Sequence, residues 1–172
     1  MSKFIKAKIA TIVDSGTTTA STANKLTESG QNFLTTVSVG DIVWNTTDGT
    51  TATVTAVDSN TVLSLSANVV PTSKAYTIYS KNGHEDQIIS VNGAILVQQA
   101  STTTVTVAYG SGSTGADILT ITHTPIASGA VTMRDAVQNQ LIASQEPGSR
   151  PNVVFDLVMP SVATVVTGIA IA

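Results

Sequence analysis

The sequence predicts a mainly β protein: a small SH3-like or OB-like β-barrel, followed by an α+β domain with one helix on a mostly antiparallel sheet. Three observations predict this. Threonine, which favours strands because it branches at Cβ, accounts for 28 of the 172 residues. Short runs of alternating apolar and hydroxyl residues recur between Gly, Asp and Asn turn signals. Only residues 132–144 have apolar side chains at convincing helical spacing.

Residues 37–66 form the centre of the first domain. Three alternating runs are separated here by turn signals at residues 47–49 and 58–60, where Gly tolerates positive φ and Asp and Asn satisfy backbone groups locally. Leu26 and Phe33 bring the chain back to the core just before this segment. The pattern predicts a β-meander.

The register across the first turn follows from matching apolar residues with each other, because a slip of one residue exchanges the two faces of a strand. A two-residue loop would set Trp44 opposite Thr53. A three-residue loop, with its glycine in the left-handed conformation, sets Trp44 opposite Ala52 and Ile42 opposite Val54, and we expect this register. The wetter face then carries Asp41, Val43 and Asn45. Across the second turn, the matched pairs are Val54 with Leu65 and Ala56 with Leu63.

The remaining elements of the first domain are less regular. The first strand of this domain is predicted at residues 6–13 and the last at residues 75–79. With the three strands of the meander, they complete the five strands of a small barrel over residues 1–80. Residues 14–25 are a Ser/Thr-rich stretch without apolar periodicity. Loops of this length are usually functional or mobile, so a contact arm toward a neighbouring subunit and a solvated loop are both open.

Polar and charged residues cluster at residues 81–86, which predicts a linker between the domain of residues 1–80 and a second domain of residues 87–172. We expect the second domain to fold without the first, because it has its own helix and a complete apolar pattern. Its predicted strands are residues 88–98, 102–109, 116–124, 153–159 and 162–171.

The helix predicted at residues 132–144 begins with Thr132 and Asp135, which approximate a capping box. It ends before Glu146-Pro147-Gly148. Its apolar face consists of Met133, Ala136, Val137, Leu141 and Ile142. We expect this face to cover one side of the second sheet.

Several turn and strand motifs carry a resemblance to a known family. In the first domain they are Leu26, residues 29–33 (SGQNF), 39–41 (VGD), 45–47 (NTT), Thr50, residues 57–59 (VDS) and 63–65 (LSL); in the second domain, residues 117–124 (DILTITHT). With these motifs, residues 5–80 resemble a small β-module of virion structural proteins from tailed bacteriophages, most like those of cyanobacterial phages. The later segment is similar to a second module of such proteins. The resemblance implies a capsid decoration (cement) protein or an accessory virion component. As a decoration protein it would lie on the capsid exterior, be made in the host cytoplasm and have the major capsid protein as its partner.

Composition limits the other functions. Charged residues make up only 11% of the chain, the net charge is −3, and the only basic cluster is Lys3, Lys6 and Lys8, so we expect no nucleic-acid partner. The sequence has no cysteine, which excludes disulfides and thiolate metal sites. The apolar run at residues 9–13 is too short for a signal-peptide core, and that at residues 162–172 is too short to span a membrane as a helix. We expect no membrane partner.

A glycine-rich segment and two histidines are the first candidates for chemistry. Residues 110–115 match the dinucleotide pattern G-x-G-x-x-G after a strand, but a strand pattern follows instead of the required helix, so we predict a hairpin loop. His84 and His123 have no second ligand at metal spacing, and we expect His123 to make a hydrogen bond at a strand edge or interface. Glu85, Asp86 and Asp117 do not form a calcium-loop pattern.

The last candidates are a sequon and four aromatic residues. Asn45-Thr46-Thr47 matches a glycosylation sequon, which we interpret as the flank of a turn. Aromatic faces stack on sugars, so Trp44, Tyr76, Tyr79 and Tyr109 are candidates for a glycan platform, although they are spread over both domains.

We therefore predict no catalytic, cofactor-binding or metal site, and a non-enzymatic virion structural protein that bridges shell subunits. A host-adhesion or glycan-binding module of a tail or fibre is the alternative, whereas a glycan hydrolase would need a carboxylate pair that no motif shows. Few charges and few edge-blocking lysines or prolines predict a homo-oligomer. The resemblance favours a trimer, because capsid lattices offer threefold positions.

Overall fold

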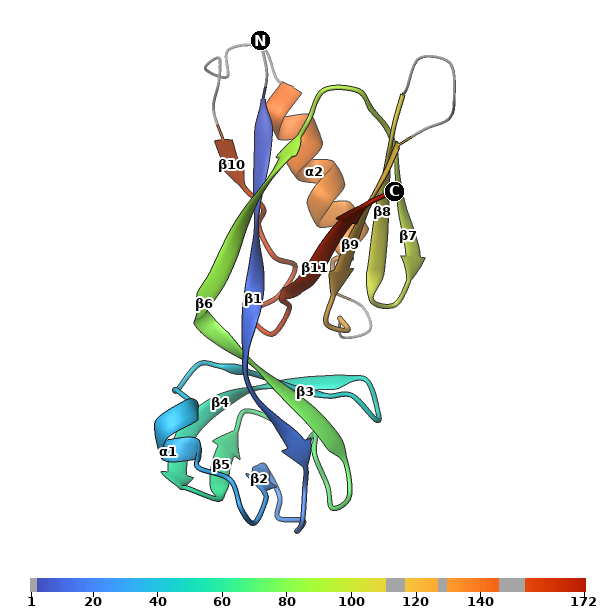
Figure 1. Cartoon of the computed structure of the whole chain (residues 1–172). Helices are drawn as coiled ribbons and strands as arrows, with labels where there is room; N and C mark the ends of the chain where they lie inside the picture. Colours follow the sequence, from blue (N-terminus) through green and yellow to red (C-terminus); the bar gives the residue numbers. More distant parts are fainter. Residues whose placement is uncertain (1–2, 111–116, 127–129, 146–153) are drawn as a thin grey trace. The chain divides into compact units, whose positions relative to one another are not determined.

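The structure is a computed structural model that describes residues 3–110, 117–126, 130–145 and 154–172. It is mainly β, as predicted, and its contacts divide it into two compact units (Figure 1). Residues 10–84 form one, called here the meander unit. Residues 1–9 and 85–172 form the other, called the helix unit. Two long strands, β1 (Phe4–Thr17) and β6 (Ala75–Ser90), contribute residues to both.

The change from one unit to the other does not take place in a loop. Residues 81–86, predicted as a linker, lie in the middle of the continuous strand β6. The helix unit begins at Glu85, within the predicted segment, but it also takes the first nine residues of the chain. Five of the six residues at 81–86 are exposed. Their polar character therefore reflects an exposed part of a strand and not a linker.

The meander unit contains β2 (Lys25–Thr27), α1 (Phe33–Thr36), β3 (Ile42–Asn45), β4 (Thr50–Ser59) and β5 (Val62–Leu65). Its strands follow the order β2-β5-β4-β3-β6-β1, and the bridge between Ala20 and Thr27 connects the segment after β1 with β2. Leu26 and Phe33 are completely buried in its core, as predicted.

The register predicted between β3 and β4 is wrong by one residue. Trp44 pairs with Thr51 and Val43 with Ala52, so the loop has four residues, 46–49, rather than three. Gly49 does have a positive φ, of 69°. Consequently Val43 and Asn45 point into the core with Ala52, whereas Trp44 is half-buried on the other face.

Asn45 explains this register. Its side chain is completely buried, and its Oδ1 accepts hydrogen bonds from the backbone N–H groups of Thr47 and Asp48 at 2.9 and 3.0 Å. Its Nδ2 donates to the carbonyl of Val69 at 2.7 Å and to the carboxylate of Asp48 at 2.9 Å. A buried amide is tolerated only when its polar atoms are paired, and here it also organises the loop. Matching by hydrophobicity therefore placed Asn45 on the wrong face.

Across the second turn the prediction is half correct. Val54 pairs with Leu65 as expected, but Leu63 pairs with Val57 instead of Ala56 because a register shift follows Val54. A β-bulge adds one residue to one strand of the pair, and hydrophobic alternation alone does not place it.

The helix unit contains β7 (Ala94–Ser101), β8 (Thr104–Tyr109), β9 (Asp117–His123), α2 (Met133–Gln145), β10 (Val154–Asp156) and β11 (Val166–Ile171). β11, β9, β8 and β7 form an antiparallel sheet in that order. β1 pairs with β10 and β11 in parallel, so the whole sheet is mixed, with both parallel and antiparallel pairs.

The predicted strand of residues 88–98 is in fact the end of β6, a turn and β7. The turn contains Asn92-Gly93, with Gly93 at a φ of 84°. Asn-Gly is the strongest short-range hairpin signal, and it was present in the sequence.

The predicted helix is present as α2, and its capping box is formed. The backbone N–H of Asp135 donates to Thr132 Oγ1 at 3.1 Å, and the backbone N–H of Thr132 donates to the Asp135 carboxylate at 3.3 Å. Met133, Val137 and Leu141 are buried in the core of the helix unit, whereas Ile142, also predicted to be apolar core, is exposed.

Candidate binding surface

The glycine-rich segment joins two antiparallel strands. β8 and β9 pair along their whole length from Thr104 with Thr122 to Tyr109 with Asp117. A dinucleotide site needs a helix after this segment, and β9 stands there instead. Gly110 donates its backbone N–H to the Gly93 carbonyl at 2.9 Å, and residues 111–116 lie outside the described residues.

The two histidines lie in different units. His84 is exposed in the meander unit, and its Nδ1 lies 3.1 Å from the Asn82 carbonyl oxygen. In the part of the chain that the structure describes, no three His, Cys, Asp or Glu side chains gather as metal ligands would. Of the acidic candidates, Asp86 approaches Lys6 at 3.6 Å and Asp117 lies at a groove described below.

His123 makes hydrogen bonds, as expected, but it is completely buried in a strand with neighbours on both sides rather than at a sheet edge. Its Nδ1 lies 2.8 Å from the Thr124 carbonyl oxygen and must donate to it, so its Nε2 is free to accept from Gln99 Nε2 at 3.1 Å. Burial lowers the pKa of His123, although the bond to Thr124 opposes this effect. The imidazole is therefore a neutral structural group.

Gln99 connects this histidine to the helix. Its Oε1 accepts the backbone N–H of Arg134 in the first turn of α2 at 3.1 Å. The first N–H groups of a helix have no partner within the helix, so Gln99 satisfies one of them from β7. Sequence reasoning missed this role, because nothing local links Gln99 to a helix that begins more than thirty positions later.

The sequon lies at a turn, and two of the four candidate aromatic side chains, Tyr76 and Tyr79, are buried. Asn45 is buried with its amide fully engaged, so its sequon is the flank of a turn, as predicted. Trp44 and Tyr79 stack with their ring centroids 6.4 Å apart, but Tyr79 is 5% exposed. Tyr76 is buried in the core of the meander unit, and Tyr109 belongs to the helix unit.

Among the described residues of the helix unit, one face of the sheet formed by β7, β8, β9 and β11 carries no charged side chain. In β8 and β9, buried residues alternate with half-buried or exposed ones, and the registers with β7 and β11 assign the outward positions of those two strands. None of the outward positions is charged, since Asp117 lies on the inward side in register with Leu119 and Ile121. We call this surface the threonine face. Its residues are Leu96, Gln98, Thr104, Thr106, Ala108, Ile118, Thr120, Thr122, Gly168 and Ala170.

The strand registers order the threonine face into rows. Leu96, Ala108 and Ile118 lie side by side across three strands and form an apolar row. Thr106 and Thr120 pair in the next row, and Thr104 and Thr122 in the one after it. A charged surface usually keeps soluble proteins apart, so an ordered surface without charge is suited to contact with another protein.

A groove of about 360 Å³ opens beside this sheet in the helix unit. One wall is the end of β6 with the turn after it, at Gln87, Ile88, Ser90 and Asn92. The opposite wall is β11, at Ile169 and Ile171. Ile88 and Ile171 are 61% and 76% exposed, so the rim is apolar on both sides. The volume is at the lower end of the range of about 300–1,000 Å³ found for ligand sites, so the groove holds a few side chains and not a folded domain.

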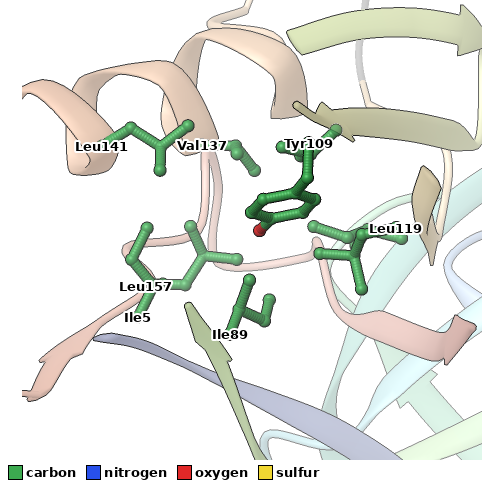
Figure 2. A pocket seen from close by; sticks show the side chains of 9 residues that line it. Ile5, Ile89, Tyr109, Leu119, Val137, Leu141 and Leu157 are labelled. Atoms are coloured by element: carbon green, nitrogen blue, oxygen red, sulfur yellow. The ribbon is translucent and has the colours of Figure 1, made fainter. Parts of the chain in front are cut away.

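The floor of the groove consists of Ile89, Tyr109 and Leu119. The Tyr109 hydroxyl donates to the Ser90 carbonyl at 2.8 Å, which ties β8 to the end of β6, and burial raises the pKa of this phenol. Figure 2 shows the same three residues from the core side, where they meet Val137 and Leu141 of α2. The cavity there is only about 10 Å³, about the minimum for one water molecule, so the core behind the floor is closed.

Comparisons with protein-family models, with curated proteins and with solved structures each gave no match. Among the described residues, no helix is both long and apolar enough to cross a membrane. The threonine face and the groove are therefore the candidate binding features of the helix unit.

Proposed function

We propose that the chain is a non-enzymatic virion structural protein, a capsid decoration or cement protein that binds the major capsid protein and bridges neighbouring shell subunits. The threonine face carries this proposal. Four strands present a surface of hydroxyl, amide and aliphatic groups without a single charge. Desolvating such a surface costs less than desolvating ion pairs, so it supports a large, permanent contact with another protein.

A homo-oligomer, with a trimer favoured, belongs to the same proposal. β7 ends the strand order and carries Ile95 and Leu96 without lysine, proline or any charge. Edge strands of this kind pair with further strands unless they are covered. For the meander unit we propose an SH3-like or OB-like barrel, which the bridge between Ala20 and Thr27 supports.

The test of the function is to look for the protein on particles. An antibody against the chain should label the exterior of intact purified virions of the phage that encodes it, and the density of such particles should contain the helix unit outside the shell. Absence of the chain from purified particles would contradict the proposal. Labelling confined to tail fibres would favour the host-adhesion alternative instead.

The role of the threonine face is tested by a substitution that would place one charge inside the proposed interface. Thr120→Lys, at the centre of the face, should reduce shell binding and self-association, because an unpaired charge in a closed interface is costly. Gln138→Lys is the matched control, since Gln138 is exposed on α2. Light scattering should give a trimer of the 17.6 kDa chain in low and in molar salt. A monomer at micromolar concentration contradicts the association, and a trimer lost in salt contradicts its uncharged basis.

A further inference from the structure

We infer that the groove between β6 and β11 accepts an extended segment of the partner protein, which pairs as an additional strand with the free edge of β11 and places a lysine or arginine beside Asp117. This inference rests on the proposed binding function and names how the partner is held. Three observations carry it: an unpaired strand edge, an apolar floor beneath that edge, and a single charged side chain at one end.

The first observation is the edge of β11. In the strand order, β1 lies next to β11, but the two pair only at Ile9 with Val166. Nearer its amino-terminal end, β1 pairs with β10 instead, from Phe4 with Val154 to Lys6 with Asp156. Among the residues that the structure describes, no strand lies beside the rest of that edge of β11. The groove occupies this position.

The backbone groups that face the groove follow from the register with β9. Ala172 and Ile118 exchange two hydrogen bonds, at 3.0 and 2.9 Å. In an antiparallel pair, such hydrogen-bonded positions alternate with positions whose N–H and C=O groups point to the other side. Ile171 opposite Leu119 and Ile169 opposite Ile121 are the alternate positions. Their N–H and C=O groups therefore point away from β9, as in a sheet edge open to another strand.

The second observation is the floor. Ile89, Tyr109 and Leu119 lie beneath this edge, and exposed Ile88 and Ile171 flank it. An extended peptide projects every second side chain to the same face. Main-chain bonds to the edge would supply affinity, and aliphatic side chains at alternate positions would fill the floor, as in other cases of strand addition.

The third observation is charge. Asp117 is the only charged side chain among the described residues that line the groove. It lies just beyond the end of β11, because Ile118 already pairs with Ala172. A strand antiparallel to β11, the more stable arrangement, has its amino-terminal end at this position. The partner segment therefore begins with a basic residue and continues with alternating aliphatic and hydroxyl residues.

The probe for this site is the peptide acetyl-Lys-Val-Thr-Val-Thr-Val-amide, added to the full chain. In wild-type protein, NMR hydrogen exchange should show new protection of the Ile169 and Ile171 amides, whereas that of Ala170, already paired with Thr120, should change little. No saturable binding at millimolar peptide, or protection at Ala170 alone, would overturn the inference. This measurement needs no variant and no virion, so its failure is separate from failure of the proposed function.

Two variants sharpen the test. Ile171→Pro removes an outward N–H without removing a bond to β9 and should weaken peptide binding about tenfold, whereas Ile171→Thr keeps the N–H and should weaken it less. Asp117→Asn should weaken binding of the lysine peptide about threefold and should strengthen binding of the peptide with Glu in place of Lys, because it removes an attraction in the first case and a repulsion in the second. Equal affinity of wild type and Ile171→Pro would overturn the strand pairing. Loss of self-association in Ile171→Pro would assign the groove to a second copy and overturn its assignment to a partner.

Discussion

Gln99 Nε2 in β7 and His123 Nε2 in β9 lie 3.1 Å apart, and this contact joins two strands to the beginning of α2. The imidazole can accept from Gln99 only while its Nε2 is unprotonated. Protonation would place two donors face to face and would put a charge in the core. The neutral form of His123 is thus part of the folded structure, which makes the stability of the helix unit dependent on pH.

We predict that stability falls as the pH is lowered below about 6.5, the ordinary pKa of histidine. The folded pKa of His123 is lower than this value, so between the two pKa values the unfolded chain binds more protons than the folded chain. The contribution is complete above pH 6.5 and is lost as the pH falls toward the folded pKa. Urea unfolding between pH 8 and pH 5 measures it.

His123→Gln should remove the part of this slope that belongs to His123 and should lower the free energy of unfolding by about 1–3 kcal/mol at pH 8, because Gln99 and the Thr124 carbonyl lose a partner. His84→Gln removes the other histidine and is the control. A slope that disappears with His84 and persists without His123 would contradict the assignment.

Asn45 provides a second prediction. Asn45→Ala should destabilise the meander unit by about 1–3 kcal/mol, because the Val69 carbonyl and two loop N–H groups lose their buried partner. Asn45→Asp should be at least as costly at neutral pH, since a carboxylate would face the carboxylate of Asp48 and the Val69 carbonyl.

Thr46→Ala is the matched control for both variants, because Thr46 is exposed in the same loop. Thermal melts at pH 7 and pH 4 separate the effects: acid should partly rescue Asn45→Asp, whose carboxyl then becomes neutral, but not Asn45→Ala. A melting temperature of Asn45→Ala equal to that of wild type would show that the amide does not hold the loop.

Val54 tests the core that the sequence did predict. The residue is 1% exposed and pairs with Leu65 in the meander unit. Val54→Asp should cost several kcal/mol, about 3 or more, because it leaves an unpaired charge in the core. Thr55→Asp, one position along the same strand and exposed, should change stability by less than about 1 kcal/mol. Similar urea midpoints for the two variants would contradict the assignment of the faces.

The elements that the sequence predicts well are those with local signals. α2 was found from the period of Met133, Val137 and Leu141 and from its capping box, and Leu26 and Phe33 were placed correctly in the core. The register at β3 was missed because a buried Asn45 reverses the usual rule that polar residues face water. The hairpin at Asn92-Gly93 was missed although its signal was local.

The candidate surfaces had weaker signals. Threonine alternates with aliphatic residues in β8 and β9, but only the strand registers show that Thr106 and Thr120 lie together on one face. The groove depends on β6 and β11, which are more than sixty positions apart in the chain, and on the edge of β11 beyond Val166, with which no described strand pairs. A strand edge that lacks a pairing partner leaves no local pattern in a single sequence, so the groove could not be predicted.

The last prediction concerns residues 1–9, which belong to the helix unit although they are far from the rest of it in the sequence. Ile5 and Ala7 are buried in the core of the helix unit together with Leu157 and Val107. The Leu157 backbone N–H donates to the Lys6 carbonyl at 2.8 Å, and Lys6 Nζ lies 3.0 Å from the Asp156 carboxylate. A fragment of residues 87–172 would lack this strand and keep a void in its core. We therefore expect the reverse of what the sequence alone predicts: the fragment should show no cooperative unfolding transition.

A peptide of residues 1–13, added at millimolar concentration, should restore the transition by occupying the place of β1 beside β10. The same peptide with Ile5→Asp should not, because its charge would enter the core formed by Leu157 and its neighbours. Circular dichroism melts of the fragment alone, with either peptide, and of the full chain make the comparison. If the fragment alone unfolds cooperatively, β1 is dispensable and the division at the 81–86 segment describes the folding units better than the contacts do.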